Sequence, residues 1–153
     1  MRPYVEALTA RGVAASAVDI PKGRAERAVP SFVVAVPPGR DAVVGGRSYG
    51  GRVASLAAVE VDYAGLVVIS YPLHAPGRFG AASERTAHWP SIRCPVLLLA
   101  GEADPFARID LLREAVGLLP NAVLVTYPAG GHGLMPERDD LARHIAEFVS
   151  RLR

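Results

Sequence analysis

The sequence has one cysteine among its 153 residues, one lysine and no long hydrophobic run. Because Cys94 is the single cysteine, the chain can form neither an internal disulfide nor a metal site built from several cysteines. No apolar stretch approaches the about 20 residues that cross a bilayer, and the first twelve residues lack the apolar core of a secretion signal. We therefore expect a cytoplasmic protein with no membrane partner.

The sequence also lacks a large excess of charge of either sign, since its net charge is only +2. The arginines that carry nearly all positive charge are scattered among acidic residues, without a basic stripe or an aromatic stacking platform, so we expect no nucleic-acid partner. His74, His88 and His144 do not have the spacing of metal ligands, and nothing resembles a phosphate loop or a dinucleotide fingerprint. The sequence therefore predicts neither a bound metal nor a cofactor.

What the sequence does contain is an alternation of apolar runs and helical patterns. Continuous apolar runs of this kind are typical of parallel strands that are buried on both faces. Helical spacing fills the intervals between them, and a last helix is expected from Pro136 onward. The pattern predicts a single α/β domain over residues 1–153, a three-layer α/β/α sandwich with a mainly parallel sheet. The expected strands span residues 41–46, 65–73, 95–101 and 122–128, and the expected helices between them span 49–60 and 107–118.

Other segments are less regular. Residues 3–11 have helical spacing, residues 13–20 are β-permissive and predict a strand, and residues 21–30 predict a charged loop. Residues 31–36 fit either a strand or a short helix. Residues 74–92 predict a long loop, and a loop of that length inside a compact domain is usually functional.

Residues 46–50 match the motif G-x-S-x-G and lie between a predicted strand and a predicted helix, as that motif requires. A serine on such a sharp turn needs a strained backbone, so Gly46 and Gly50, two residues to either side of Ser48, are expected to be glycine for steric reasons. The start of the helix also provides backbone N–H groups that favour a developing negative charge. The alternative interpretation is a glycine-rich turn in which Ser48 only caps the helix.

Two further residues follow Ser48 with the chemistry that a serine nucleophile needs. A serine hydroxyl is a poor nucleophile unless a base takes its proton, and His132, in a glycine-rich segment after the last predicted strand, is the candidate base. Asp104, just past the end of a buried strand, is the candidate acid that orients this base. The alternatives are a surface-loop histidine for His132, a cap of the helix near Pro105 for Asp104, and Glu102 as a rival acid. The order Ser48, Asp104, His132 is the order found in α/β-hydrolases.

The stretches that contain these residues resemble the α/β-hydrolases. They are GGRSYGGRVAS, YPLHAPG, RTAHWPSIRCPVLLLAGEADPF and GGHGL, in the order in which the family has them. More narrowly, they are similar to the dienelactone-hydrolase-like group that includes the testis-expressed hydrolase-like protein and the hydrolase-like subunit of the NSL acetyltransferase complex. The resemblance implies Ser48 as nucleophile, Asp104 as acid and His132 as base. It also implies that the backbone N–H of Tyr49 is one donor of the oxyanion hole.

The resemblance also implies that the first strands of the fold are missing. In the family, several strands precede the helix to which residues 3–11 correspond, and a glycine-rich loop after the third of them supplies a second oxyanion donor. Residues 13–20 and 41–46 correspond to the fourth and fifth strands, so a truncated α/β-hydrolase fold is expected, with an unpaired gap or a direct pairing between these two strands. A late start, a truncated copy, or a partner chain or second copy that completes the sheet would each explain this, and we favour the first two.

The leading hypothesis is a serine hydrolase that acts on a small ester or thioester through an acyl-enzyme, without a cofactor. Loss of one oxyanion donor would lower turnover by about a hundredfold to a thousandfold, so weak activity is expected. The rival hypothesis is a catalytically inactive, hydrolase-like scaffold or interaction protein. Acyl transfer to an acceptor other than water would use the same residues. His74 and Trp89, in the long predicted loop, are candidates to line the substrate pocket, although Trp89 fits a packing role more often than a substrate platform.

Overall fold

The centre of the molecule is a parallel sheet of four strands that lie in chain order. The computed structural model describes residues 1–152. Each neighbouring pair of strands is parallel, and the registers place Arg47 opposite Ile69 and Ile69 opposite Leu99, so the carboxyl ends of the strands reach one edge of the sheet. The strands are β1 (Gly39–Arg47), β2 (Tyr63–Ile69), β3 (Val96–Gly101) and β4 (Ala122–Tyr127).

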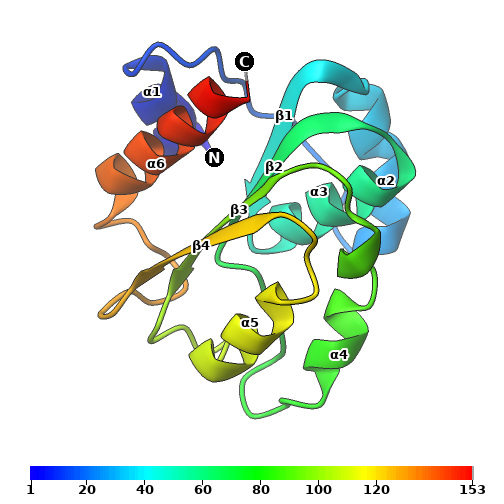
Figure 1. Ribbon diagram of the computed structural model, residues 1–153, viewed down its shortest axis with the longest axis vertical. Coiled ribbons are helices and arrows are strands. Elements are labelled where there is room, and N and C mark those ends of the chain that lie inside the picture. Colours follow the sequence, from blue (N-terminus) through cyan, green and yellow to red (C-terminus); the bar gives the residue numbers. More distant parts are fainter. Residues whose placement is uncertain (153) are drawn as a thin grey trace.

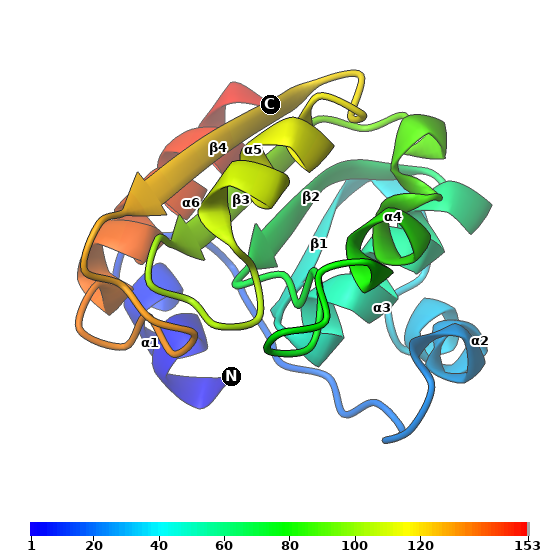
Figure 2. The same ribbon diagram turned by 90° about the horizontal axis from the view of Figure 1, so that it is seen from below.

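Helices cover both faces of this sheet, which gives the three layers that the sequence predicts (Figures 1 and 2). Alternate strand residues point to opposite faces. Leu66 and Val68 of β2 therefore pack in one core with α2 (Ala25–Ala35), α3 (Tyr49–Glu60) and α5 (Ile109–Val116). Val67 and Ile69 pack in the other core, with α1 (Arg2–Thr9) and α6 (Arg138–Arg151). None of the helices within residues 1–152 has the length and apolar character that crossing a membrane would require.

Helix α2 corrects the prediction of a charged loop at residues 21–30 and decides between the two alternatives for residues 31–36. Ala28, Val29 and Phe32 are buried at helical spacing, and they pack in the core that α3 also lines. Pro30 lies inside this helix and interrupts the local helical signal, because proline lacks the backbone N–H of a helix interior. Burial of one face of α2 against α3 therefore outweighs the unfavourable effect of Pro30 on the helix.

The strand predicted at residues 13–20 is wrong, because these residues have no regular structure. Val18 and Ile20 are partly buried against the core without joining the sheet. A β-permissive sequence forms a strand only where a neighbouring strand accepts its hydrogen bonds. Within residues 1–152, β1 pairs with β2 alone, so neither the unpaired gap nor the direct pairing expected from the resemblance occurs.

Two predicted boundaries also change in the second half of the chain. The strand expected at 65–73 ends at Ile69, because Ser70 has a φ of 50°, which an extended strand cannot continue. The long loop expected at 74–92 contains α4 (Ala81–Thr86) and a short 3₁₀ helix, η1 (Trp89–Ser91). The helices expected at 49–60 and 107–118 and the strands expected at 95–101 and 122–128 are confirmed as α3, α5, β3 and β4 with small shifts of their ends.

Candidate active site

Ser48 occupies the tight turn between β1 and α3. Its backbone has a φ of 51° and a ψ of −118°, a combination that is costly for a residue with a side chain. Its N–H donates a hydrogen bond to the Ile69 carbonyl at 2.8 Å, which ties the turn to the end of β2. Ser48 makes no side-chain hydrogen bond to the start of α3, so its hydroxyl does not cap that helix.

The turn requires glycine at two positions, and only one of them is a position that the motif suggested. A Cβ at Gly46 would collide with the backbone of Gly50, and a Cβ at Gly51 would lie 2.8 Å from the Gly46 carbonyl oxygen. A Cβ at Gly50 would meet nothing within 4 Å. The steric expectation is therefore correct for Gly46 and wrong for Gly50, because the close approach is between Gly46 and the first turn of α3.

The structure brings the side chains of Ser48, His132 and Asp104 into one hydrogen-bonded chain. Ser48 Oγ lies 2.8 Å from His132 Nε2, and His132 Nδ1 lies 2.8 Å from Asp104 Oδ2. An ionised carboxylate only accepts hydrogen bonds, so Nδ1 carries the proton of the neutral ring and Nε2 is free to accept the Ser48 hydroxyl proton. The side chain of Asp104 is fully buried, whereas that of His132 is 24% exposed.

Asp104 lies in the loop after β3 and makes a second hydrogen bond there. Its Oδ1 accepts from the Phe106 N–H at 2.8 Å, which holds the carboxylate in place. Helix α5 begins later, at Ile109, so Asp104 does not cap it. The rival acid, Glu102, does not contact His132, because its Oε1 accepts hydrogen bonds from Thr126 and Arg113.

His132 lies in the loop between β4 and α6, and two residues that the sequence did not indicate hold this loop. The Phe106 ring packs against the His132 ring with centroids 4.6 Å apart. Tyr4 of α1 is buried, and its hydroxyl donates to the Gly133 carbonyl at 3.1 Å. These contacts join distant parts of the chain, and no local motif marks them.

His74 and Trp89 are buried and do not line a pocket, so the pocket expectation is wrong and, for Trp89, the packing alternative is correct. Each is 1% exposed. The Trp89 ring packs edge-on against Tyr71 with centroids 5.0 Å apart, inside the core between the sheet and α3. Both ring nitrogens of His74 are hydrogen-bonded to backbone groups. Trp89 begins η1, whereas His74 lies in the irregular segment before α4, and both side chains point inward.

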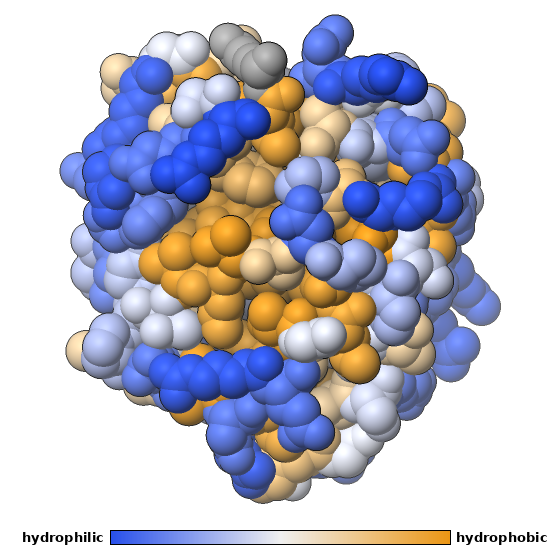
Figure 3. Space-filling view, in the orientation of Figure 1, coloured by the Kyte–Doolittle hydropathy of each residue, from blue (hydrophilic) through white to orange (hydrophobic). Residues whose placement is uncertain are grey.

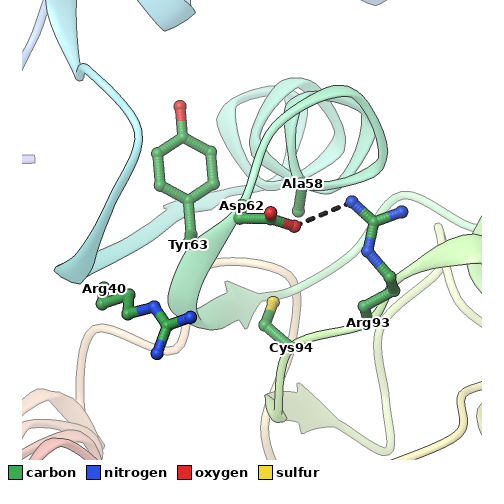
Figure 4. A pocket seen from close by; sticks show the side chains of 6 residues that line it. All are labelled: Arg40, Ala58, Asp62, Tyr63, Arg93 and Cys94. Carbon is green, nitrogen blue, oxygen red and sulfur yellow. Dashed lines mark hydrogen bonds and ion pairs between the residues drawn. The ribbon is translucent and has the colours of Figure 1, made fainter.

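Two surface cavities lie away from Ser48, Asp104 and His132. The larger, of about 300 Å³, lies between α1 and the start of α6. The other, of about 260 Å³, lies at the amino ends of β1, β2 and β3, opposite the edge that carries the three side chains (Figure 4). It contains the Asp62–Arg93 ion pair at 2.7 Å and Cys94, and burial raises the pKa of the Cys94 thiol, which disfavours the reactive thiolate. Within residues 1–152, no group of side chains has the arrangement of a metal site.

A serine on a strained turn between a parallel strand and a helix, with an acid and a histidine after later strands, defines the α/β-hydrolase class of fold. A family model for the alpha/beta hydrolase domain matches residues 21–151, and the chain therefore belongs to that family. A comparison with curated protein sequences finds no match.

Solved structures share this fold at low sequence identity. An esterase of Pyrococcus furiosus is 19% identical with a TM-score of 0.77, and the match covers 99% of this chain and 74% of the esterase. A thermophilic esterase of Thermogutta terrifontis is 17% identical with a TM-score of 0.70, and the match covers 99% and 84%. A monoacylglycerol lipase of Paleococcus ferrophilus is 14% identical with a TM-score of 0.71, and the match covers 86% and 77%. At these identities the likeness establishes the fold alone.

Proposed function

We propose that this protein is a serine hydrolase that cleaves small carboxylic esters or thioesters, with Ser48 as nucleophile, His132 as base and Asp104 as acid. The observation that supports this most is the chain of two 2.8 Å hydrogen bonds through His132. A nucleophile, a base within hydrogen-bond reach and a buried acid that orients the base are the three parts that activate a serine hydroxyl. The esterases and the lipase that share the fold favour the same ester chemistry.

In the first half of the proposed reaction, Ser48 Oγ attacks the substrate carbonyl carbon while its proton passes to His132 Nε2. The imidazolium that forms is stabilised by the carboxylate of Asp104. The tetrahedral intermediate then collapses, and the alcohol or thiol leaves with the proton from His132, so that an acyl-enzyme remains on Ser48. A water molecule then attacks the acyl carbon while His132 Nε2 takes its proton. The bond to Ser48 Oγ breaks, His132 returns the proton to Ser48, and the carboxylic acid is released. Transfer of the acyl group to another acceptor would share the first half.

The tetrahedral intermediate has a negative oxygen that needs hydrogen-bond donors. The N–H of Tyr49 is the first of α3, where backbone N–H groups have no partner within the helix, and we assign it as one donor. It is the single donor that we assign. Because each oxyanion donor is worth about a hundredfold to a thousandfold in turnover, a site that used this donor alone would have a low kcat.

The chain contains a second close serine–histidine pair, which we do not propose as a nucleophile. Ser55 Oγ lies 2.9 Å from His88 Nε2, but the Ser55 hydroxyl donates its proton to the Arg52 carbonyl at 2.8 Å. His88 must then donate to Ser55 and cannot act as its base. Ser55 is also 1% exposed, so a substrate cannot reach it. It provides a matched control for Ser48.

The proposal is tested by labelling with a fluorophosphonate probe, read by intact mass. We expect one adduct on the wild-type protein and on Ser55→Ala, and none on Ser48→Ala. Hydrolysis of p-nitrophenyl acetate should follow the same pattern. A folded wild-type protein that takes up no probe would refute the proposal and favour a hydrolase-like scaffold. Within the family, we propose that the chain is similar in activity to the dienelactone-hydrolase-like group, and a screen of lactone and ester substrates would test this.

A further inference from the structure

His74 is a buried histidine with both ring nitrogens engaged by the backbone. Its Nδ1 lies 2.9 Å from the Ala75 carbonyl oxygen, and its Nε2 lies 2.9 Å from the Arg108 backbone nitrogen. A carbonyl oxygen only accepts and a backbone N–H only donates, so His74 is neutral with its proton on Nδ1. Nε2 therefore serves as a hydrogen-bond acceptor in the interior of the protein.

These contacts hold the loop that carries Asp104. The His74 backbone N–H donates to the Phe106 carbonyl at 3.0 Å, and the Arg108 N–H donates to His74 Nε2. His74 is thus the donor in one hydrogen bond to residues 106–108 and the acceptor in the other. Phe106 is the residue whose N–H holds Asp104 Oδ1 and whose ring packs against His132. One backbone segment thus connects His74 to both Asp104 and His132.

A second set of contacts covers the His74 ring on its outer side. The Phe79 ring packs edge-on against the His74 ring with centroids 5.0 Å apart, and the Arg108 guanidinium lies 4.6 Å from the centre of the Phe79 ring. Burying an imidazole is unfavourable unless its nitrogens are hydrogen-bonded, and an apolar residue would avoid that requirement altogether. A histidine at this position is explained by the hydrogen bond that it accepts.

We propose that His74 is a positioning residue for the acid and the base: it holds Phe106 and Arg108 so that the Asp104 carboxylate stays aligned with His132. This inference rests on the proposed function in one respect, that Asp104 and His132 act as acid and base. His74 itself touches no reacting atom. Its effect on the rate comes from the geometry of the Asp104 loop, where a displacement of about 1 Å costs about a hundredfold.

The test compares His74→Gln with His74→Met. Glutamine places an amide oxygen near the position of Nε2 and keeps the acceptor, whereas methionine has a similar volume and no comparable acceptor. For His74→Met we expect kcat with p-nitrophenyl acetate and the rate of fluorophosphonate labelling to fall about tenfold to a hundredfold, with KM little changed. His74→Gln should retain most of both rates. Loss of packing alone would lower both variants together.

A second measurement reports on the site without any turnover. The proton between His132 Nδ1 and Asp104 gives a low-field proton resonance in NMR spectra, which is assigned by its absence in His132→Gln. We expect this resonance in the wild type and in His74→Gln, and its shift or loss in His74→Met. If the chain hydrolyses nothing but the resonance responds in this way, the proposed function fails, whereas the role of His74 in aligning the Asp104 side chain with His132 stands.

A second pair of variants breaks the same hydrogen bond from the side of Arg108, and this pair tests the inference if His74→Met does not fold. Arg108 has a φ of −54°, which proline can adopt, so Arg108→Pro removes the N–H that donates to His74. Arg108→Ala keeps that N–H and removes only the side chain. We expect Arg108→Pro to lose the resonance and the rate, and Arg108→Ala, which loses only the contact with Phe79, to keep the resonance and most of the rate. Wild-type resonance and kcat in either folded His74→Met or folded Arg108→Pro would overturn the inference.

Discussion

Strained residues gather at the edge of the sheet where the candidate active site lies. Within residues 1–152, the non-glycine residues with positive φ are Ser48, Ser70 and Leu134, with values of 51°, 50° and 46°. Ser48 follows β1, Ser70 follows β2, and Leu134 is two residues from His132. Such backbone conformations cost about 1–3 kcal/mol each and persist where the surrounding structure holds them. Hydrogen bonds from Ser48 to the Ile69 carbonyl and from Ser70 to the Leu99 carbonyl provide that support.

The glycines of the turn give a first prediction at this scale. Gly51→Ala should destabilise the protein by about 1–3 kcal/mol, because its Cβ would press on the Gly46 carbonyl. Gly50→Ala should be neutral or stabilising, because the space there is open and alanine favours a helix over glycine by about 1 kcal/mol. Urea unfolding of the two variants measures this difference. Equal stability of the two would contradict the geometry of the turn.

His88 gives a second prediction, on the pH dependence of stability. Burial, with a smaller effect of the Arg52 charge, lowers the pKa of His88 to about 4, and Glu26 opposes this shift. The unfolded chain, with a pKa near 6.5, takes up the proton first as the pH falls. The contribution of His88 to the free energy of unfolding is therefore present above pH 6.5 and is lost as the pH falls towards 4.

His88→Gln is the matched variant for this prediction, because its amide can still donate to Ser55 and cannot titrate. Urea unfolding measured at several pH values should show a shallower loss of stability below pH 6.5 for the variant than for the wild type. The same slope in both proteins would show that His88 does not titrate in this range.

At the scale of elements, α1 supports the loop of His132 from the far end of the chain. The contact is the hydrogen bond from the Tyr4 hydroxyl to the Gly133 carbonyl, 129 positions apart in sequence. Tyr4→Phe keeps the ring and removes this bond, so we expect a loss of about 1 kcal/mol in stability and slower labelling of Ser48. Arg2→Ala on the exposed surface of α1 is the control, and it should change neither quantity. A Tyr4→Phe protein with wild-type labelling would show that α1 does not position this loop.

The scale of elements is also where local sequence preferences proved least informative. Residues 13–20 have β-branched residues and form no strand, whereas Pro30 lies inside a helix. In both cases the available neighbour decides, because residues 13–20 join no ladder and α2 finds an apolar face on α3. By contrast, β2 and β3 are buried along nearly their whole length, and their continuous apolar runs predicted them well.

At the scale of the whole molecule, both edges of the sheet are open within the described residues, since β1 pairs only with β2 and β4 only with β3. The sequence of β4, AVLVTY, has no charge and no proline, and Val123 is 53% exposed. Figure 3 shows hydrophobic surface in the middle of the face on which β4 lies. Natural proteins usually protect such edges with charges, so this one is a candidate for pairing with a second copy.

We therefore expect the protein to self-associate as its concentration rises, and Val123→Lys to weaken this association. Val34→Lys is the matched control, because Val34 is 82% exposed on α2, away from the sheet edge. Sedimentation velocity over a range of concentrations measures the effect. Equal weakening by both variants would point to general surface hydrophobicity, and a wild type that stays monomeric throughout would refute pairing at β4.

The sequence by itself determined the class of fold and the three side chains that meet at the site. Buried parallel strands leave continuous apolar runs, and the turn at Ser48 requires small residues at short range, so both leave local traces. Only the tertiary structure decided that, within residues 1–152, β1 pairs with β2 alone and that Gly51 rather than Gly50 must be glycine. It also decided that His74 and Trp89 face inward and that Phe106 and Tyr4 contact the loop of His132. These outcomes depend on which distant segments pack together, and no local pattern of residues records that.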